Sequence, residues 1–350
     1  VSQATPELAD RAVREAANAF DHWKRIPYTE RARYLFHAAK IMRERKHEFS
    51  ALMVYEAGKP WVEADADTAE AIDFMEFYGR EMLRLGKPHP THPEPNHETE
   101  LHYIPLGVGV VIPPWNFPCA IMTGMTTATI VTGNTAVLKP ASATPVIAAW
   151  LAEIFVDELH LPAGVLNFLP GPGGAVGDVL VDHPLTRFIA FTGSKEVGIR
   201  INQRAAAVHP GQKWLKRTIL EMGGKDSIIV DETADLDEAA AGIVSAAFGY
   251  SGQKCSACSR AIIAAPVYDA LLQKIVERTQ KLDVGDPALG PGIEMGPVID
   301  EKALKKHLEY IEIGKGEGRL VAGGERVARP EGGYFLQPTV VADLDPRARL

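Results

Sequence analysis

This sequence of 350 residues has few cysteines, no excess of positive charge and no long apolar run. Three cysteines in so long a chain do not make a disulfide framework, which suits a reducing compartment. The formal net charge is −8 and the basic residues are scattered, which argues against a nucleic acid or an anionic membrane as partner. No apolar run reaches the roughly 18 residues that span a bilayer, and the first residues lack the apolar core of a signal peptide. We therefore expect a cytoplasmic or matrix-type enzyme.

The spacing of apolar residues differs between regions of the chain. With 46% hydrophobic residues, the chain has enough apolar material for roughly two to three globular domains. Residues 6–85 repeat apolar positions every three or four residues, which predicts two or three amphipathic helices. Residues 86–100 are rich in proline and polar residues and are typical of a linker. The histidines in and after this stretch are spaced irregularly among prolines, which favours a solvated loop over a metal site: His89, His92, His97 and His102.

After Leu101, short apolar runs alternate with longer helical patterns. This alternation predicts an α/β fold in which parallel strands are crossed by helices. We expect a Rossmann-like, doubly wound domain that binds a dinucleotide, formed together with the N-terminal helices by residues 1–220. We expect residues 221–350 to form a second α/β domain, the catalytic domain, which carries the segment with Cys255 and Cys258.

The segment "GYSGQKCSACSR", residues 249–260, contains two of the three cysteines. A metal site made of cysteine usually needs a second Cys-x-x-Cys pair, which the sequence lacks, and a redox pair would need a thioredoxin-like context. The small and polar neighbours of Cys255 suit an open turn leading into a helix, where peptide dipoles and Lys254 would stabilise a thiolate nucleophile. Burial as a small hydrophobic residue is the commoner fate of a free cysteine, and we assign Cys119 and Cys258 to it.

Two polar residues suit the companions that a thiol nucleophile requires. Glu221 in "LEMGGKD" lies where a carboxylate at a domain junction can activate water, although an exposed glutamate at a strand end would look the same. Asn116 in "VIPPWNFP" follows a predicted strand, and its amide is suited either to an oxyanion or to a helix cap.

Three further segments suggest a phosphate or nucleotide site. "FTGSKEVG" follows an apolar run and begins a helical pattern, so Ser194 and nearby N–H groups suit a pyrophosphate. "LPGPGGAVGDVL" offers a similar glycine-rich turn with Gly171 and Gly173, and neither segment matches G-x-G-x-x-G. Lys139 in "VLKPASATP" ends a predicted strand, where it suits ribose hydroxyls or is simply a solvated surface charge.

Taken in order, "PWNFP", "LKP", "FTGS", "EMGGK" and "GQKCS" resemble the aldehyde dehydrogenase superfamily over nearly the whole chain. Longer segments, including "YEAGKPWVEADADTAEAIDF" and "LEMGGKDSIIVDETADLD", look more narrowly like the bacterial 1-pyrroline-5-carboxylate dehydrogenases, which oxidise L-glutamate γ-semialdehyde in proline breakdown. The resemblance implies that Cys255 is the nucleophile, that Asn116 and the Cys255 N–H form the oxyanion hole, and that Glu221 activates the hydrolytic water. It implies no metal.

The resemblance also implies NAD as cofactor and names residues for it. Near the dinucleotide it places these side chains and turns: Ile112, Pro114, Trp115, Lys139, Ser142, Gly171, Gly173, Thr192, Gly193 and Ser194. Ser142 departs from the pattern, because the family often has there a glutamate that binds the adenosine ribose and repels a 2′-phosphate. A hydroxyl carries no repelling charge, so NADP use stays open.

For the substrate, the resemblance implies an aldehyde pocket lined by Glu70 and Phe117, with Lys254 and Ser256 at the α-carboxylate. A cationic amine and a hydroxyl suit an anionic amino-acid semialdehyde, and Glu70 suits its ammonium group, although the helix of Glu70 is crowded with acids. The alternatives are a dehydrogenase for another semialdehyde and a non-catalytic nucleotide-binding module.

Measured against the family pattern, the sequence starts late and stops early, at "VADLDPRARL". The pattern continues there with a glutamate for the nicotinamide ribose, an interface strand and the loop that anchors the substrate carboxylate. We therefore expect weak or no turnover from this chain by itself and normal chemistry from a full-length parent. We expect that parent to be a homo-oligomer whose bridging segment follows the predicted linker.

Overall fold

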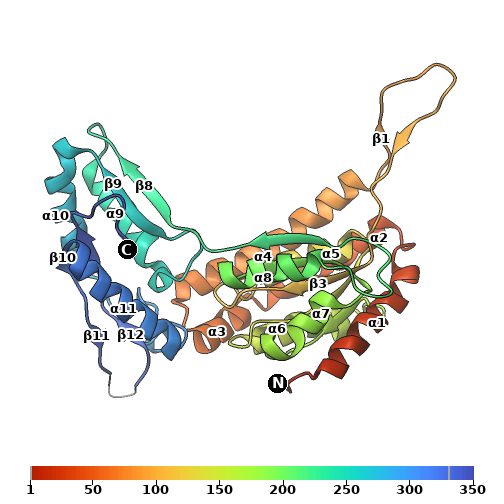
Figure 1. Cartoon of the computed structure of the whole chain (residues 1–350), viewed down its shortest axis with the longest axis horizontal. Coiled ribbons are helices and arrows are strands. Elements are labelled where there is room, and N and C mark those ends of the chain that lie inside the picture. The colour runs from red at the N-terminus through yellow and green to blue at the C-terminus, as the bar shows by residue number, and fades with distance from the viewer. Residues whose placement is uncertain (1, 330–331) are drawn as a thin grey trace. The chain divides into compact units, whose positions relative to one another are not determined.

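The computed structural model describes residues 2–329 and 332–350, which form two compact units (Figure 1). The first unit contains the residues up to Leu52 and Asp65–Met222, and the second contains Met53–Ala64 and Gly223–Leu350. The two units divide after Met222, whereas the domain boundary was predicted after residue 220, and the assignment differs at two places. Residue 221 belongs to the first unit because its strand pairs with the first sheet, and residues 53–64 leave the N-terminal helices to pack within the second unit.

The N-terminal region forms four helices, where two or three were predicted. Pro27 precedes the second helix, and Gly58 with φ +63° and Pro60 separate the third from the fourth. The first helix is capped by Thr5, whose Oγ1 accepts a hydrogen bond from the Leu8 N–H at 3.4 Å. These helices are α1 (Pro6–Trp23), α2 (Tyr28–Glu44), α3 (Lys46–Ala57) and α4 (Trp61–Leu85).

A five-stranded parallel sheet forms the centre of the first unit, in the order β5-β4-β3-β6-β7. The chain runs outward from β3 through β4 to β5 and then returns to the other side of β3, which gives the doubly wound topology that the sequence predicts. Its strands are β3 (Val108–Ile112), β4 (Thr135–Leu138), β5 (Leu166–Phe168), β6 (Thr186–Thr192) and β7 (Arg217–Glu221). The helices between them are α5 (Ala120–Val131), α6 (Pro145–Glu153), α7 (Asp178–Asp182) and α8 (Lys195–Ala206).

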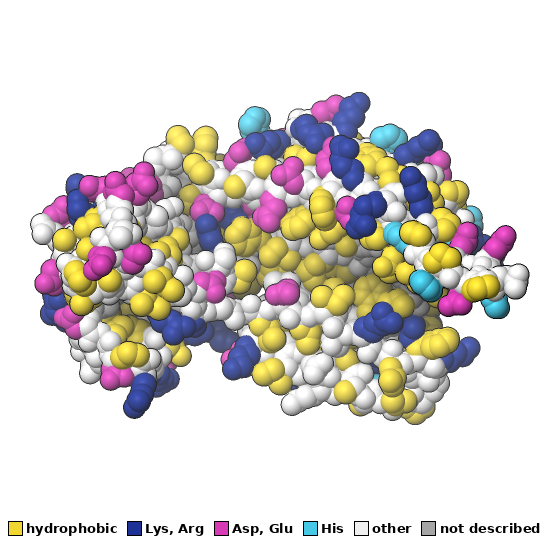
Figure 2. All heavy atoms as spheres, turned by 90° about the horizontal axis from the view of Figure 1, so that it is seen from above, with side chains coloured by type: hydrophobic (Ala, Val, Ile, Leu, Met, Phe, Trp, Pro, Cys, Tyr) yellow, Lys and Arg dark blue, Asp and Glu magenta, His cyan; other side chains and the backbone are white. Residues whose placement is uncertain are grey.

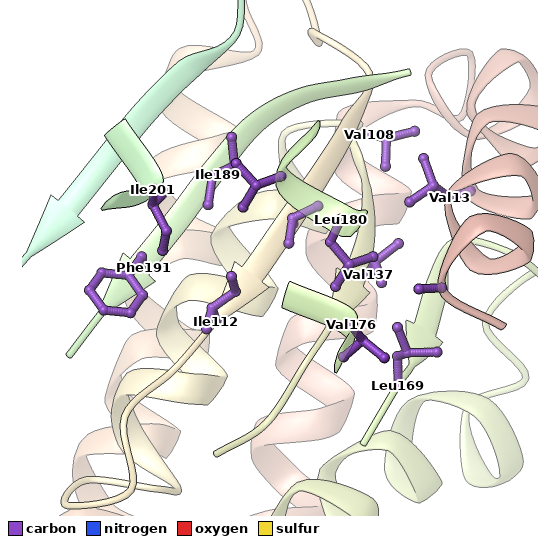
Figure 3. Packing of buried hydrophobic residues seen from close by; sticks show 14 of the residues in the cluster. Val13, Val108, Ile112, Val137, Leu169, Val176, Leu180, Ile189, Phe191 and Ile201 are labelled. Carbon is purple, nitrogen blue, oxygen red and sulfur yellow. The ribbon is translucent and has the colours of Figure 1, made fainter. Parts of the chain in front are cut away.

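Both faces of the central strands β3 and β4 are buried and β6 is mostly buried, whereas the edge strand β7 is exposed or half-buried. Alternate residues of β3 and β6 point to one face, where they meet α1, α7 and α8, as Figure 3 shows for Val13, Val108, Ile189 and Ile201. On the other face Val111 is also fully buried. Parallel strands buried on both sides explain the short continuous apolar runs of the sequence.

The predicted linker forms a small antiparallel hairpin, β1 (His89–Pro90) with β2 (Glu100–Leu101), where the sequence favoured a loop without strands. Its residues are mostly exposed, and three histidine rings contact different groups: His89 the Leu85 carbonyl, His97 the Pro95 carbonyl and His102 the Glu100 carboxylate. In the space-filling view, Asp and Glu side chains lie between the Lys and Arg side chains (Figure 2). None of the described helices is long and apolar enough to cross a membrane.

The second unit contains a parallel pair of strands, β8 (Asp226–Val230) and β9 (Cys258–Ile263). Two helices pack on this pair through a small core that includes Val230, Ile243 and Leu271. They are α9 (Leu236–Phe248), capped by Asp235, and α10 (Tyr268–Thr279). The rest of the unit contains α11 (Glu301–Glu317), the pair β10 (Arg319–Ala322) and β13 (Val340–Ala342), and the pair β11 (Arg326–Val327) and β12 (Phe335–Leu336).

Candidate active site

The predicted cofactor residues of the first unit lie at the carboxyl ends of its parallel strands or in the segments that follow them. β3 is followed by Pro114 and Trp115, and β6 ends at Thr192, directly before Gly193 and Ser194. Because the connections leave β3 on one side and return to β6 on the other, a crevice is expected between the carboxyl ends of these two strands. Doubly wound proteins bind nucleotides at that switch point. The sheet topology therefore fits a dinucleotide at the predicted residues.

Ser194 caps α8, because its Oγ accepts a hydrogen bond from the Val197 N–H at 3.4 Å. The start of a twelve-residue helix gathers N–H groups and the positive end of the helix dipole, as a pyrophosphate requires. After β5, Gly171 is buried and Gly173 begins a π-helical turn, and a Cβ added to Gly173 would meet nothing within 4 Å. Open space above this backbone leaves room for a ligand.

Lys139 is buried, with only 5% of its surface exposed, so the interpretation as a solvated surface charge is wrong. Its Nζ donates a hydrogen bond to the Pro140 carbonyl at 2.8 Å. Burial lowers the pKa of this ammonium to about 8, because the charged form loses its water.

Two other predicted cofactor residues differ in exposure. Ser142, three residues after Lys139, is exposed in the loop after β4. Ile112 ends β3 with its side chain in the core beside Phe191 (Figure 3), so only its backbone is available to a cofactor.

The segment after β3 also orients Asn116 and Phe117. The Asn116 Oδ1 accepts a hydrogen bond from the Phe117 N–H at 3.1 Å, which fixes the plane of the amide. Asn116 does not cap the next helix, since the N-cap of α5 is Cys119. Asp67 accepts a hydrogen bond from the Ala120 N–H at 2.7 Å, so α4 lies against this segment one turn from exposed Glu70. The structure thus brings the helix of Glu70 to the loop of Phe117.

Glu221 is the last residue of β7 and is exposed. It pairs in register with Thr192 of β6, and its carbonyl accepts a hydrogen bond from the Gly193 N–H at 3.0 Å. Glu221 therefore lies at the same edge of the sheet as the "FTGS" turn. Nucleophile and base belong to different units, and the meeting of Asn116, Glu221 and Cys255 stays a prediction.

Cys255 is exposed in a turn between α9 and β9, whereas Cys119 and Cys258 are buried and all three thiols are free. The distinction made from sequence between one accessible thiol and two buried ones is therefore confirmed. Burial raises the pKa of the Cys258 thiol, which keeps it protonated. A predicted detail is wrong: the turn of Cys255 leads into strand β9 and not into a helix, so no helix N-terminus begins there.

Lys254 forms an ion pair that sequence reasoning missed. Its Nζ lies 2.6 Å from Glu63 Oε1, and both side chains are largely buried. Gly249 permits this pair, because a Cβ there would lie 2.8 Å from Glu63 Oε1. The amine that we expected to stabilise a thiolate is therefore held by a carboxylate, while Ser256 is exposed. Glu63 lies in the run of acids before Glu70, where no pattern distinguished it.

The glycines of "EMGGK" and the cysteine turn meet, although they are far apart in sequence. A Cβ on Gly224 would lie 2.8 Å from the Cys255 carbonyl oxygen, so only glycine fits this approach. This contact explains the second of the two glycines after Glu221, whereas a Cβ on Gly223 would meet nothing within 4 Å. Among the described residues, His, Cys, Asp and Glu form no group of three or more that could hold a metal ion.

Comparison with known proteins agrees with this geometry. The sequence profile of the aldehyde dehydrogenase family matches residues 1–350. The chain belongs to the aldehyde dehydrogenase family, with the fold that the sequence predicts. It is 62% identical over its whole length to a 1-pyrroline-5-carboxylate dehydrogenase of Geobacillus sp. (strain WCH70), covering 67% of that protein.

Two solved structures extend the comparison. The 1-pyrroline-5-carboxylate dehydrogenase from Thermus with bound NAD superposes with a TM-score of 0.96 at 49% identity, over 99% of this chain and 67% of that one. An NADP-dependent enzyme from E. coli superposes with a TM-score of 0.89 at 36% identity, over 99% of this chain and 70% of that one. Relatives that share the fold thus include enzymes described with each of the two nicotinamide cofactors.

Proposed function

We propose that this protein oxidises L-glutamate γ-semialdehyde, the open form of 1-pyrroline-5-carboxylate, to L-glutamate in proline degradation, with NAD as hydride acceptor. The observation that carries this proposal is the 62% identity to a 1-pyrroline-5-carboxylate dehydrogenase over the entire chain. The exposed Cys255 thiol and the dinucleotide-type sheet edge supply the two parts that such an oxidation requires.

The cofactor would be held at the carboxyl edge of the first sheet. Lys139 would bind ribose hydroxyls, and the N–H groups at the start of α8 would bind the pyrophosphate, with Ser194 beside them. The open backbone at Gly173 accommodates close approach of a ligand. When bound, NAD supplies the hydride acceptor of the reaction.

The chain's own residues would carry the covalent chemistry. The Cys255 thiolate attacks the aldehyde carbon, and the oxyanion that forms accepts hydrogen bonds from the Asn116 amide and the Cys255 N–H. Oxidation of this adduct leaves a thioester on Cys255. Glu221 then takes a proton from water as the water attacks the thioester carbon, which releases glutamate and restores the thiolate.

Substrate recognition follows from charge. Lys254 and Ser256 would face the α-carboxylate and Glu70 the α-ammonium group, with Phe117 lining the pocket. Glu63 limits the net positive charge beside Lys254. Lys254 would therefore bind the substrate α-carboxylate while it stays paired with Glu63, and not as an isolated cation.

The test is formation of NADH by the full-length parent protein, followed by absorbance, with 1-pyrroline-5-carboxylate as substrate. We expect Cys255→Ala to abolish turnover while NAD still binds, and Cys258→Ala, which alters a buried thiol three residues away, to retain it. Turnover on simple aldehydes but not on this substrate would discard the proposed specificity. Full turnover by Cys255→Ala would overturn the mechanism.

We also propose that the enzyme is a cytoplasmic homo-oligomer. Three free thiols support a reducing compartment. In the first unit, Trp214 and Leu215 expose large apolar side chains near the edge strand β7, which supports contact with another copy. Size-exclusion chromatography with light scattering should show an assembly that Leu215→Glu weakens.

A further inference from the structure

We propose that Gln253 is a positioning residue for the nucleophile. Its buried side-chain amide fastens a left-handed turn of the backbone to the segment 296–299, and this turn sets the direction in which the chain enters Cys255. The inference rests on the proposed function, because it assumes that Cys255 attacks the substrate. Every contact that supports it lies within the second unit.

The turn between α9 and Cys255 has an unusual backbone. Tyr250 and Ser251 have φ values of 52° and 58°, and Gly252 follows with φ 69°. Left-handed conformation is disfavoured for residues with a side chain, above all for a bulky one such as tyrosine. Three left-handed residues in succession persist only where surrounding contacts hold them. The sequence hint is "GYSG", in which glycines flank the two strained residues.

The Gln253 amide provides such contacts with both of its ends. Its Nε2 donates to the Tyr250 carbonyl and to the Pro297 carbonyl, each at 3.3 Å, and its Oε1 accepts from the Ile299 N–H at 2.9 Å. Only a side chain with both a donor and an acceptor at this reach satisfies all three groups. Glutamate has the same length but, when ionised, cannot donate, and asparagine is one methylene shorter.

The strained residues are also fastened directly. The Tyr250 hydroxyl donates to the Ala57 carbonyl at 3.1 Å, and the Ser251 hydroxyl donates to the Gly296 carbonyl at 2.7 Å. The Lys59 ammonium lies 4.8 Å from the centre of the Tyr250 ring. The turn is thus attached to two separate segments, one around residue 57 and one around residue 296.

These two supporting segments are themselves in close contact. A Cβ on Gly296 would lie 2.4 Å from the Gly58 carbonyl oxygen, and a Cβ on Gly58 would lie 2.7 Å from Pro297 Cγ. Since two glycines are needed for this approach, the support under the turn has little freedom to shift. Beyond the turn, Gly224 packs on the Cys255 carbonyl. The nucleophile itself is exposed, so its position depends on the backbone on either side.

The first experiment separates the position of the thiol from its reactivity. In the full-length parent protein, Gln253→Glu and Gln253→Ala are compared with the unaltered sequence and with Gln273→Ala, which changes an exposed glutamine on α10. One assay measures kcat and KM for 1-pyrroline-5-carboxylate. The other measures the rate of Cys255 alkylation by iodoacetamide from pH 6 to 10, with the site identified by mass spectrometry. Alkylation requires an accessible thiolate, but not one aimed at a bound substrate.

For both Gln253 variants we expect kcat to fall at least about tenfold, since misplacing a reacting group is costly. KM and the alkylation profile should stay within about twofold of those of the unaltered chain. An unchanged kcat overturns the inference. A parallel loss of turnover, alkylation and melting temperature also overturns it, because that pattern describes general unfolding of the region.

A second pair of variants covers the case in which Gln253 variants do not fold. Ser251→Ala and Ser251→Gly both lose the hydroxyl, but only glycine adopts the left-handed conformation without strain. We expect Ser251→Gly to retain several times more kcat than Ser251→Ala, with equal alkylation rates. Equal kcat values would show that the left-handed turn does not position the thiol. A failure of the proposed function would look different from a failure of this inference. If Cys255 is not the nucleophile, Cys255→Ala keeps its turnover, with glutamine or with any other residue at position 253.

Discussion

The central strands of the first unit are buried to a very different extent from the pair β8 and β9 of the second unit. Every residue of β3 and β4 in the first unit is buried, whereas most residues of β8 and β9 in the second unit are exposed or half-buried. The predicted cofactor residues therefore follow strands fixed by a large apolar core, and the predicted nucleophile lies on a turn fixed by buried hydrogen bonds. The proposed reaction would thus rely on two kinds of scaffold, one maintained by burial and the other by polar contacts.

A matched pair of substitutions tests this contrast most strongly. Val110 of β3 has no exposed surface, and Ile229 of β8 is 76% exposed. Val110→Asp places a carboxylate in the core at a cost of several kcal/mol, a large part of a typical total stability of about 5–15 kcal/mol. Ile229→Asp should change the free energy of unfolding by no more than about 0.5 kcal/mol. Urea unfolding followed by circular dichroism measures both.

Val110→Ala serves as the control for that pair, because it removes apolar contacts without adding charge. We expect it to lie between the two aspartate variants. If Ile229→Asp unfolded the chain as completely as Val110→Asp, the exposed side of β8 would be as important to folding as the core of β3, and the contrast between the units would be wrong.

Two glycines distinguish packing from ligand approach within the first unit. A Cβ on Gly109 of β3 would lie 2.3 Å from the Phe188 ring, so Gly109→Ala should cost about 1–3 kcal/mol through overpacking. A Cβ on Gly173 would meet nothing within 4 Å, so Gly173→Ala should leave the free energy of unfolding within about 0.5 kcal/mol. If a nucleotide approaches that backbone, the same variant should weaken NAD binding severalfold. Thermal melts and fluorescence titration with NAD measure the two effects, and a destabilised Gly173→Ala with normal NAD affinity would contradict both expectations.

Much of the first unit was predictable because its signals are local. Short apolar runs at regular spacing indicate parallel strands, and the residues after each run then fall at one edge of the sheet, as Pro114, Lys139 and Ser194 do. The accessible thiol was predictable from the polar neighbours of Cys255. The number of N-terminal helices was not, since a continuous helical period conceals breaks such as Gly58.

The second unit was harder to predict because its contacts join distant segments. Nothing near Lys254 in sequence indicates Glu63, and nothing near Gln253 indicates Pro297 or Ile299. The turn after α9 also misled the prediction of a helix after Cys255: small and polar residues mark an open turn, but they do not determine whether a helix or a strand follows.

Lys139 allows a test of how burial and function compete. Burial lowers its pKa from 10.5 to about 8, so in this window the unfolded chain binds more protons than the folded one. Stability therefore rises with pH between about 8 and 10.5, and the burial penalty is complete below pH 8. Lys139→Met should remove this rise and increase stability at pH 7 by about 1–3 kcal/mol. It should also weaken NAD binding about tenfold if the amine holds the ribose. Urea unfolding at several pH values and NAD titration measure the two effects, and a variant that is less stable at pH 7 would contradict the assignment of a burial penalty.

The smallest expected structural effect, and the most selective functional one, belongs to Ser142→Glu. Ser142 is exposed in the loop after β4, so a carboxylate there stays hydrated and the free energy of unfolding should change by less than about 0.5 kcal/mol. A 2′-phosphate near residue 142 would be repelled by the new charge, whereas ribose hydroxyls would gain an acceptor. We expect kcat/KM with NADP to fall about tenfold and kcat/KM with NAD to stay equal or rise, which corresponds to about 1.4 kcal/mol of discrimination. Ser142→Gln, which has the same length without charge, should leave the ratio of the two cofactors nearly unchanged. Equal ratios for the glutamate and glutamine variants would mean that the ribose does not reach this loop, and the cofactor preference would then have to be set at another strand end of the same sheet.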